Sequence, residues 1–147
     1  MKRKISMIVT AITLAAMLLL TLCACGGSTW GKIKSAYEKE GYHEVQLSDE
    51  LKKALNLDQI KEGDVKVTIH VMSNAKEDNA LSLLAGKTAV IMEYKNVNDM
   101  KKYMKDQYGE NGEKSFEEFW EETQKSDNVN GNCVYMGLAD SIFKGTK

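Results

Sequence analysis

The sequence of 147 residues contains no proline, two histidines, three cysteines and one arginine, Arg3. With so few histidines and cysteines, it has neither an H-E-x-x-H pair nor any clustered spacing suited to zinc. The lack of arginine beyond position 3 removes the side chain best suited to grip phosphate or carboxylate with two hydrogen bonds. A G-x-S-x-G elbow for a nucleophilic serine is also absent. Nothing in the pattern therefore supports an enzyme, and we expect no catalytic residue, no metal site and no cofactor.

The charge of the chain is mildly acidic once its first residues are set aside. Three of the 20 basic residues stand in the first four positions, so residues 25–147 carry 17 basic and 21 acidic side chains. Neither sign forms a block long enough to act as an interaction tail. Because nucleic-acid binding draws on clustered positive charge, we expect no nucleic-acid partner.

The N-terminus has the pattern of an export signal. Lys2, Arg3 and Lys4 precede an apolar run from Ile5 to Leu22. A charged start followed by an apolar run is typical of a signal peptide, although this run is also long enough to remain as an uncleaved helical anchor. In both cases the positive start stays on the cytoplasmic side and the following chain faces outward.

The end of this run reads "LCAC" over residues 22–25. It resembles the lipobox of bacterial prolipoproteins, in which a leucine stands three residues before the modified cysteine and a small residue directly precedes it. The resemblance implies that 1–24 is a signal peptide and that Cys25 carries a diacylglyceryl group in the bilayer. Residues 25–29 would then be a flexible tether. We therefore expect a protein anchored by lipid to the extracytoplasmic face of the cell membrane.

The remaining residues, 30–147, suit one domain with one modest core. Helical spacing predicts helices at 30–40, after Ser48, before Gly86, and at 98–108, 115–123 and 138–145. Strands are predicted at 43–47, 64–72, 88–94 and 132–136. The segment 64–72 alternates, whereas 88–94 is apolar on nearly both faces and is expected to be an interior strand. Helices that alternate with few strands predict an α+β fold. We expect a two-layer α/β sandwich, with helices on one face of a roughly four-stranded, mixed or mainly antiparallel sheet.

Two of these segments predict which side chains face the core. The strand at 64–72 places Lys66, Thr68 and His70 on its wetter side. That face is a candidate surface for a ligand or partner, although solvated side chains are the alternative interpretation. The helix before Gly86 is expected to turn Leu81 and Leu84 inward.

Trp30 and Cys133 are two further side chains whose surroundings the sequence predicts. Trp30 stands just after the tether, where it is expected to touch lipid headgroups. Cys23 leaves with the signal peptide and Cys25 is lipidated, so Cys133 has no disulfide partner. We favour a small buried side chain for Cys133 over a reactive or metal-binding thiol.

The function that these observations favour is non-catalytic binding of a protein or cell-envelope component at the membrane surface. The alternatives are a small-ligand-binding lipoprotein that serves transport or sensing, and a small envelope hydrolase. The second half of the chain, with "VIMEYKN" and "NCVYMG" each followed by a helix, also resembles small Gram-positive lipoproteins of no known activity. The identity of the partner and the oligomeric state stay open.

Overall fold

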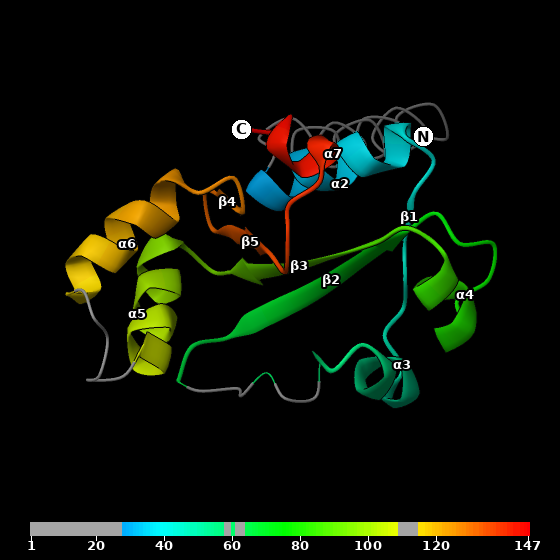
Figure 1. The fold of residues 1–147 in the computed structure, drawn as a ribbon, viewed down its shortest axis with the longest axis horizontal. Coiled ribbons are helices and arrows are strands. Elements are labelled where there is room, and N and C mark those ends of the chain that lie inside the picture. The colour runs from blue at the N-terminus through cyan, green and yellow to red at the C-terminus, as the bar shows by residue number, and fades with distance from the viewer. Residues whose placement is uncertain (1–27, 58–59, 61–63, 109–114) are drawn as a thin grey trace, which may run out of the picture.

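The computed structural model describes residues 28–57, 60, 64–108 and 115–147, so Cys25 and the signal-like run lie outside the described residues. The described chain forms a five-stranded sheet with helices around it (Figure 1). The strand order is β1-β2-β3-β5-β4, and each neighbouring pair is antiparallel. The predicted α+β class with a mainly antiparallel sheet is confirmed. The sheet has five strands rather than four.

The elements follow the expected order along the chain. The strands are β1 (His43–Glu44), β2 (Val67–Ser73), β3 (Thr88–Tyr94), β4 (Val129–Asn130) and β5 (Cys133–Tyr135). The helices are α2 (Thr29–Lys39), α3 (Asp49–Ala54), α4 (Ala80–Ala85), α5 (Val97–Tyr108), α6 (Phe116–Lys125) and α7 (Ser141–Lys144).

Local sequence signals explain where several elements begin and end. The Ser48 hydroxyl accepts the Leu51 N–H and starts α3, and Ser115 with Glu118 forms a complete capping box at the start of α6. Gly131 joins β4 to β5 with a φ of 55°, in the left-handed region that favours glycine. This turn was expected, but the two-residue strand before it was not, because so short a segment shows no alternation.

One face of the sheet is covered by α2 and α7, which pack together (Figure 1). The core between these helices and the sheet consists of Ile33, Tyr37, Met72, Ala89, Ile91, Cys133, Tyr135, Ala139 and Phe143. Its apolar members lose their contact with water on folding, which is the main stabilising contribution to this layer. Cys133 is fully buried here, as a small apolar side chain was expected to be.

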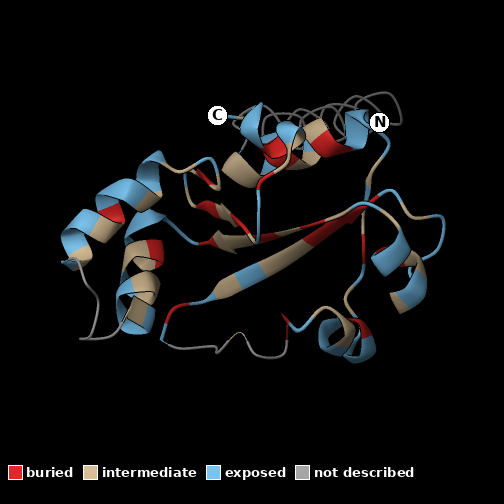
Figure 2. Ribbon diagram, viewed as in Figure 1, coloured by how far each residue is buried: buried red, intermediate tan, exposed pale blue. Residues whose placement is uncertain are grey.

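The opposite face carries the other helices, with α3 and α4 towards one end and α5 and α6 towards the other (Figure 1). Val71 packs with residues of α3 and α4, whereas its neighbour Met72 packs under α2. Successive residues of a strand point to opposite faces, so helices cover both faces at this point, where one helical layer was expected. The end of β2 beside α4 is accordingly buried on both sides (Figure 2).

The orientation of α4 differs from the prediction. Leu81 and Leu84 are 80% and 65% exposed, while Leu83 is 1% exposed and packs in the cluster that contains Leu51 and Val71. Helical spacing correctly placed Leu81 and Leu84 on one side of the helix. It did not determine which side turns inward, because so short a helix is oriented by the chain that enters and leaves it.

Substitutions in α4 should reflect this orientation. Leu83→Ala is expected to lower the free energy of unfolding by about 2 kcal/mol, since it removes buried methyl groups from a core cluster. Leu81→Ala and Leu84→Ala should each change it by less than about 0.5 kcal/mol, because their side chains are already in water. Chemical denaturation of the three variants measures the difference. Equal losses at positions 81 and 83 would contradict the observed orientation.

Candidate functional site

The three side chains expected on the wetter face of β2 have different surroundings. Lys66 and Thr68 are exposed, but the His70 side chain is only 11% exposed. The solvated interpretation of His70 is therefore wrong. It failed because α2 covers this part of the strand, and alternation within a single strand carries no information about what packs on it.

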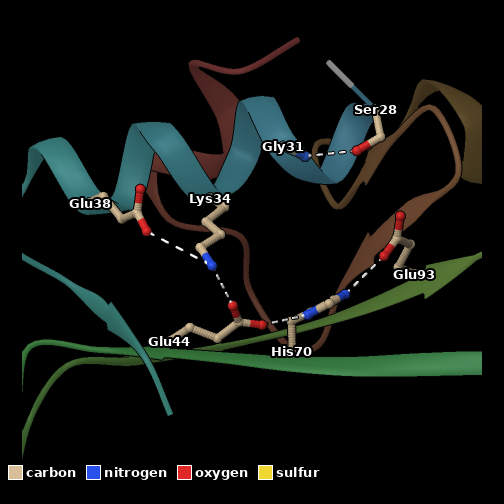
Figure 3. A network of polar contacts seen from close by, with 7 residues as sticks. All are labelled: Ser28, Gly31, Lys34, Glu38, Glu44, His70 and Glu93. Carbon is tan, nitrogen blue, oxygen red and sulfur yellow. Dashed lines mark hydrogen bonds and ion pairs between the residues drawn. The ribbon is translucent and has the colours of Figure 1, made fainter. Parts of the chain in front are cut away.

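His70 lies between two carboxylates from the strands on either side of β2. Its Nδ1 is 2.8 Å from Oε1 of Glu44 on β1, and its Nε2 is 2.9 Å from Oε2 of Glu93 on β3 (Figure 3). Both contacts are hydrogen bonds only when each ring nitrogen or its carboxyl partner carries a proton. The two ring nitrogens of His70 thus bridge the carboxylates of two neighbouring strands.

The helix α2 covers this bridge with two of its own side chains. The Trp30 ring stacks on the His70 ring at 3.7 Å between centroids and 14° between planes. Lys34 donates a hydrogen bond to Glu44 with a length of 2.7 Å. Together the five side chains tie α2 to β1, β2 and β3, and we call them the His70 clamp. One face of the Trp30 ring is consequently occupied within the domain.

The electrostatics of the clamp centre on Glu44. Burial acts to raise the pKa of this carboxyl, but hydrogen bonds and charge from Lys34 and His70 outweigh it and lower the pKa. Lys34 and Glu44 thus form an ion pair of opposite charges. Both Glu44 and Glu93 have a hydrogen-bonding partner in His70. This pattern is typical of a fixed structural contact, and it offers no unpaired group for catalysis.

The lowered pKa of Glu44 has a consequence for stability at acid pH. A carboxyl whose pKa is lower in the folded state stabilises the fold above its unfolded value of about 4.3, and this contribution is lost as pH falls through the folded value. Glu44→Gln should therefore be less stable than wild type at pH 7, and the gap should narrow below about pH 4. Denaturation across this range measures it. A gap that is constant with pH would contradict the lowered pKa.

A second feature is a half-open cavity of about 670 Å³ at the opposite end of α2. Its walls come from the end of α2, the connection between β2 and β3, and the segment from β5 to α7. Its charged and larger polar side chains are Glu40, Tyr42, Asn74, Lys87, Tyr135 and Asp140. The volume lies within the usual range for ligand sites, although the lining is more polar than most.

Asp140 is held in place at the wall of this cavity. Both of its carboxylate oxygens lie 2.8 Å from the Tyr37 hydroxyl, and Oδ1 also accepts the Phe143 N–H at 2.8 Å. The Tyr135 hydroxyl is 3.5 Å from Oδ2. Burial raises the pKa of Tyr135 to about 12, and the nearby Asp140 carboxylate adds a smaller contribution. The same two causes raise the pKa of Tyr37 further still. Both phenols therefore stay neutral and act as donors to Asp140 near neutral pH.

Two other cavity residues carry charges without a partner. Within the described part of the chain, neither the Lys87 ammonium nor the Glu40 carboxylate takes part in an ion pair, and both side chains are exposed. They line the same cavity with opposite charges. A ligand can therefore reach both groups without first breaking a contact between them.

No pattern along the sequence predicted this cavity, since its lining residues come from segments up to about a hundred positions apart. Asp140 lay inside the segment predicted as a helix, 138–145, whereas the structure begins α7 at Ser141 and places Asp140 at its N-cap. The predicted surface was Lys66, Thr68 and His70, and none of the three is among the lining residues. The predicted surface and the observed cavity are thus different places.

The remaining reactive side chains do not form a centre of their own. His43 pairs with Asp78 at 2.7 Å on the surface. Burial, with a smaller contribution from Glu93, raises the pKa of the Cys133 thiol to about 12, so it is unreactive at neutral pH. Among the described residues there is no group of three or more His, Cys, Asp or Glu side chains placed to hold a metal ion.

Two further searches bear on identity. Over the described ranges, the helices are too short or too polar to span a bilayer. Comparison of the chain with family models, with curated proteins and with solved structures found no match.

Proposed function

We propose that this chain is a lipid-anchored extracytoplasmic protein whose domain binds a small polar component of its surroundings without transforming it. The anchor rests on the likeness of residues 22–25 to a lipobox. The binding function rests on one observation, the half-open polar cavity between α2, α7 and the connection from β2 to β3.

The composition of the cavity supports binding over catalysis. Neither histidine nor cysteine is found among its lining residues. The carboxylate best positioned to act as a base, Asp140, already accepts hydrogen bonds from Tyr37 and from the Phe143 backbone. These bonds hold the Asp140 carboxylate in a fixed position at the cavity wall.

Thermal unfolding of the full chain in mild detergent tests this function against amino acids, short peptides, sugars, nucleotides and cell-wall fragments. A ligand held at about one hundred times its dissociation constant should add roughly 2.7 kcal/mol and raise the unfolding midpoint by several degrees. Ser141→Trp, at the cavity wall, should abolish this shift, while Ser35→Trp on the exposed side of α2 should preserve it. If the protein is folded and no compound raises its unfolding midpoint, ligand binding is contradicted. Chemical conversion of any compound would contradict the absence of catalysis.

Binding of a protein partner is the second candidate, and the exposed leucines of α4 favour it. Leu81 and Leu84 lie one helical turn apart and present an apolar strip to solvent. Cross-linking at position 81 in native membranes tests for such a partner. With the cross-linker kept at position 81, Leu84→Ser should lower the yield of the cross-linked product without lowering stability.

A further inference from the structure

We propose that the cavity binds a small zwitterion, meaning a molecule that carries both an ammonium and a carboxylate, such as a free amino acid or a dipeptide. This inference rests on the proposed binding function and names the chemistry of its ligand. It depends on the sign, position and pairing of the charges around the cavity.

The carboxylate of the ligand would be held by Lys87, which stands between α4 and β3. The Lys87 N–H donates to Oδ1 of Asn74 at 3.0 Å, and its carbonyl accepts the Asn74 N–H at 3.2 Å. Asn74 therefore holds both the N–H and the carbonyl of Lys87 in place. Its ammonium has no ion pair within the described ranges, so it is available to a carboxylate in the cavity.

The ammonium of the ligand would be held on the α2 and α7 side, where two carboxylates lie around Tyr42. Burial raises the pKa of Tyr42, and Asp140 and Glu40 both add to this rise, so both negative charges act on its hydroxyl. The Tyr42 ring packs edge-on against Tyr37 at 5.2 Å between centroids. An ammonium placed here gains the charge of two carboxylates that line the cavity, Glu40 and Asp140.

Other classes of ligand fit these charges less well. A neutral sugar would bury part of Lys87 and Glu40 without pairing either charge, which is unfavourable. A dianion would meet the carboxylates of Glu40 and Asp140, and a simple cation would leave Lys87 unpaired. A zwitterion of dipeptide size satisfies both signs and fits a half-open volume of about 670 Å³.

The test measures binding of three related compounds to the full chain in detergent by isothermal titration calorimetry. The compounds are alanyl-alanine, N-acetyl-alanyl-alanine without the ammonium charge, and alanyl-alaninamide without the carboxylate charge. We expect alanyl-alanine to bind and each blocked compound to bind roughly tenfold more weakly, as the loss of one charge-assisted contact requires.

Two variants assign each end of the ligand. Lys87→Gln should weaken the binding of alanyl-alanine about tenfold. It should cause no further loss of affinity for alanyl-alaninamide, because the substitution and the blocked carboxylate remove the same contact. Glu40→Gln should weaken the binding of alanyl-alanine about tenfold, because it removes the contact with the ammonium. It should cause no further loss of affinity for N-acetyl-alanyl-alanine, which has no ammonium. Lys39→Gln is the matched control, since Lys39 is exposed on α2 and does not line the cavity. Asp140 is left intact because it also holds Tyr37.

The outcomes separate this inference from the proposed function. If the compounds that lack one charge bind as tightly as alanyl-alanine, the proposal of a zwitterionic ligand is overturned. A sugar or nucleotide that raises the unfolding midpoint, with no binding of alanyl-alanine, would also overturn it and leave ligand binding in place. If no compound of either experiment binds, both proposals fail together.

Discussion

Replacing Cys25 with serine is expected to abolish the attachment of fatty acid to this protein. The proposed anchor is a thioether to the Cys25 sulfur, and a serine hydroxyl does not replace the thiol in that bond. Metabolic labelling with an alkyne-tagged fatty acid, followed by detection of the labelled band, measures the effect. We expect complete loss of label, with the chain kept at its longer precursor length because the signal is not removed.

Cys23→Ala is the matched control for this experiment. Cys23 lies two residues before Cys25 and is expected to leave with the signal peptide, so its loss should preserve both label and processing. An uncleaved helical anchor predicts a different result, in which neither the wild type nor either variant carries label and all remain in the membrane. Label that persists in Cys25→Ser would contradict attachment at Cys25.

The second large effect is expected in the His70 clamp. His70→Ala should lower the free energy of unfolding by about 3 kcal/mol, because it leaves the partly buried Glu44 and Glu93 carboxylates without their shared partner. It also removes the ring on which Trp30 stacks. For a domain of this size the loss corresponds to a fall of roughly 10 °C in the unfolding midpoint.

The surface pair of His43 and Asp78 provides the control for this prediction. Its side chains are 46% and 42% exposed, against 11% for His70, although the contact is as short, at 2.7 Å. Exposed ion pairs contribute little, so His43→Ala should cost less than about 1 kcal/mol. If the two histidine variants lose the same stability, burial of the clamp is not what makes it important.

Features that depend on neighbouring residues were predictable from the sequence. The capping box of Ser115 and Glu118 lies within four residues, and it correctly placed the start of α6. The apolar run at 88–94 correctly gave β3 as an interior strand of the sheet. These signals depend on hydrogen bonds and side-chain periodicity inside one segment, so one segment is enough to detect them.

The candidate site could not be predicted in the same way. Lys66 and Thr68 were chosen because alternation places them opposite the apolar side of the strand, and both are indeed exposed. The cavity, however, combines Glu40, Lys87 and Asp140, and no spacing along the chain relates these three residues. Their proximity results from the antiparallel pairing of β2 with β3 and from the packing of α7 beside α2.

The sequence by itself determined the α+β class, most element boundaries, the buried state of Cys133 and the proposal of an anchor at Cys25. Each of these follows from local periodicity, from end signals or from a short motif. The tertiary structure alone decided which side of α4 faces inward, that His70 is enclosed by Trp30, Glu44 and Glu93, and that a charged cavity forms at the end of α2. The physical reason is that burial and charge pairing depend on which segments pack together, and that packing is a property of the whole chain.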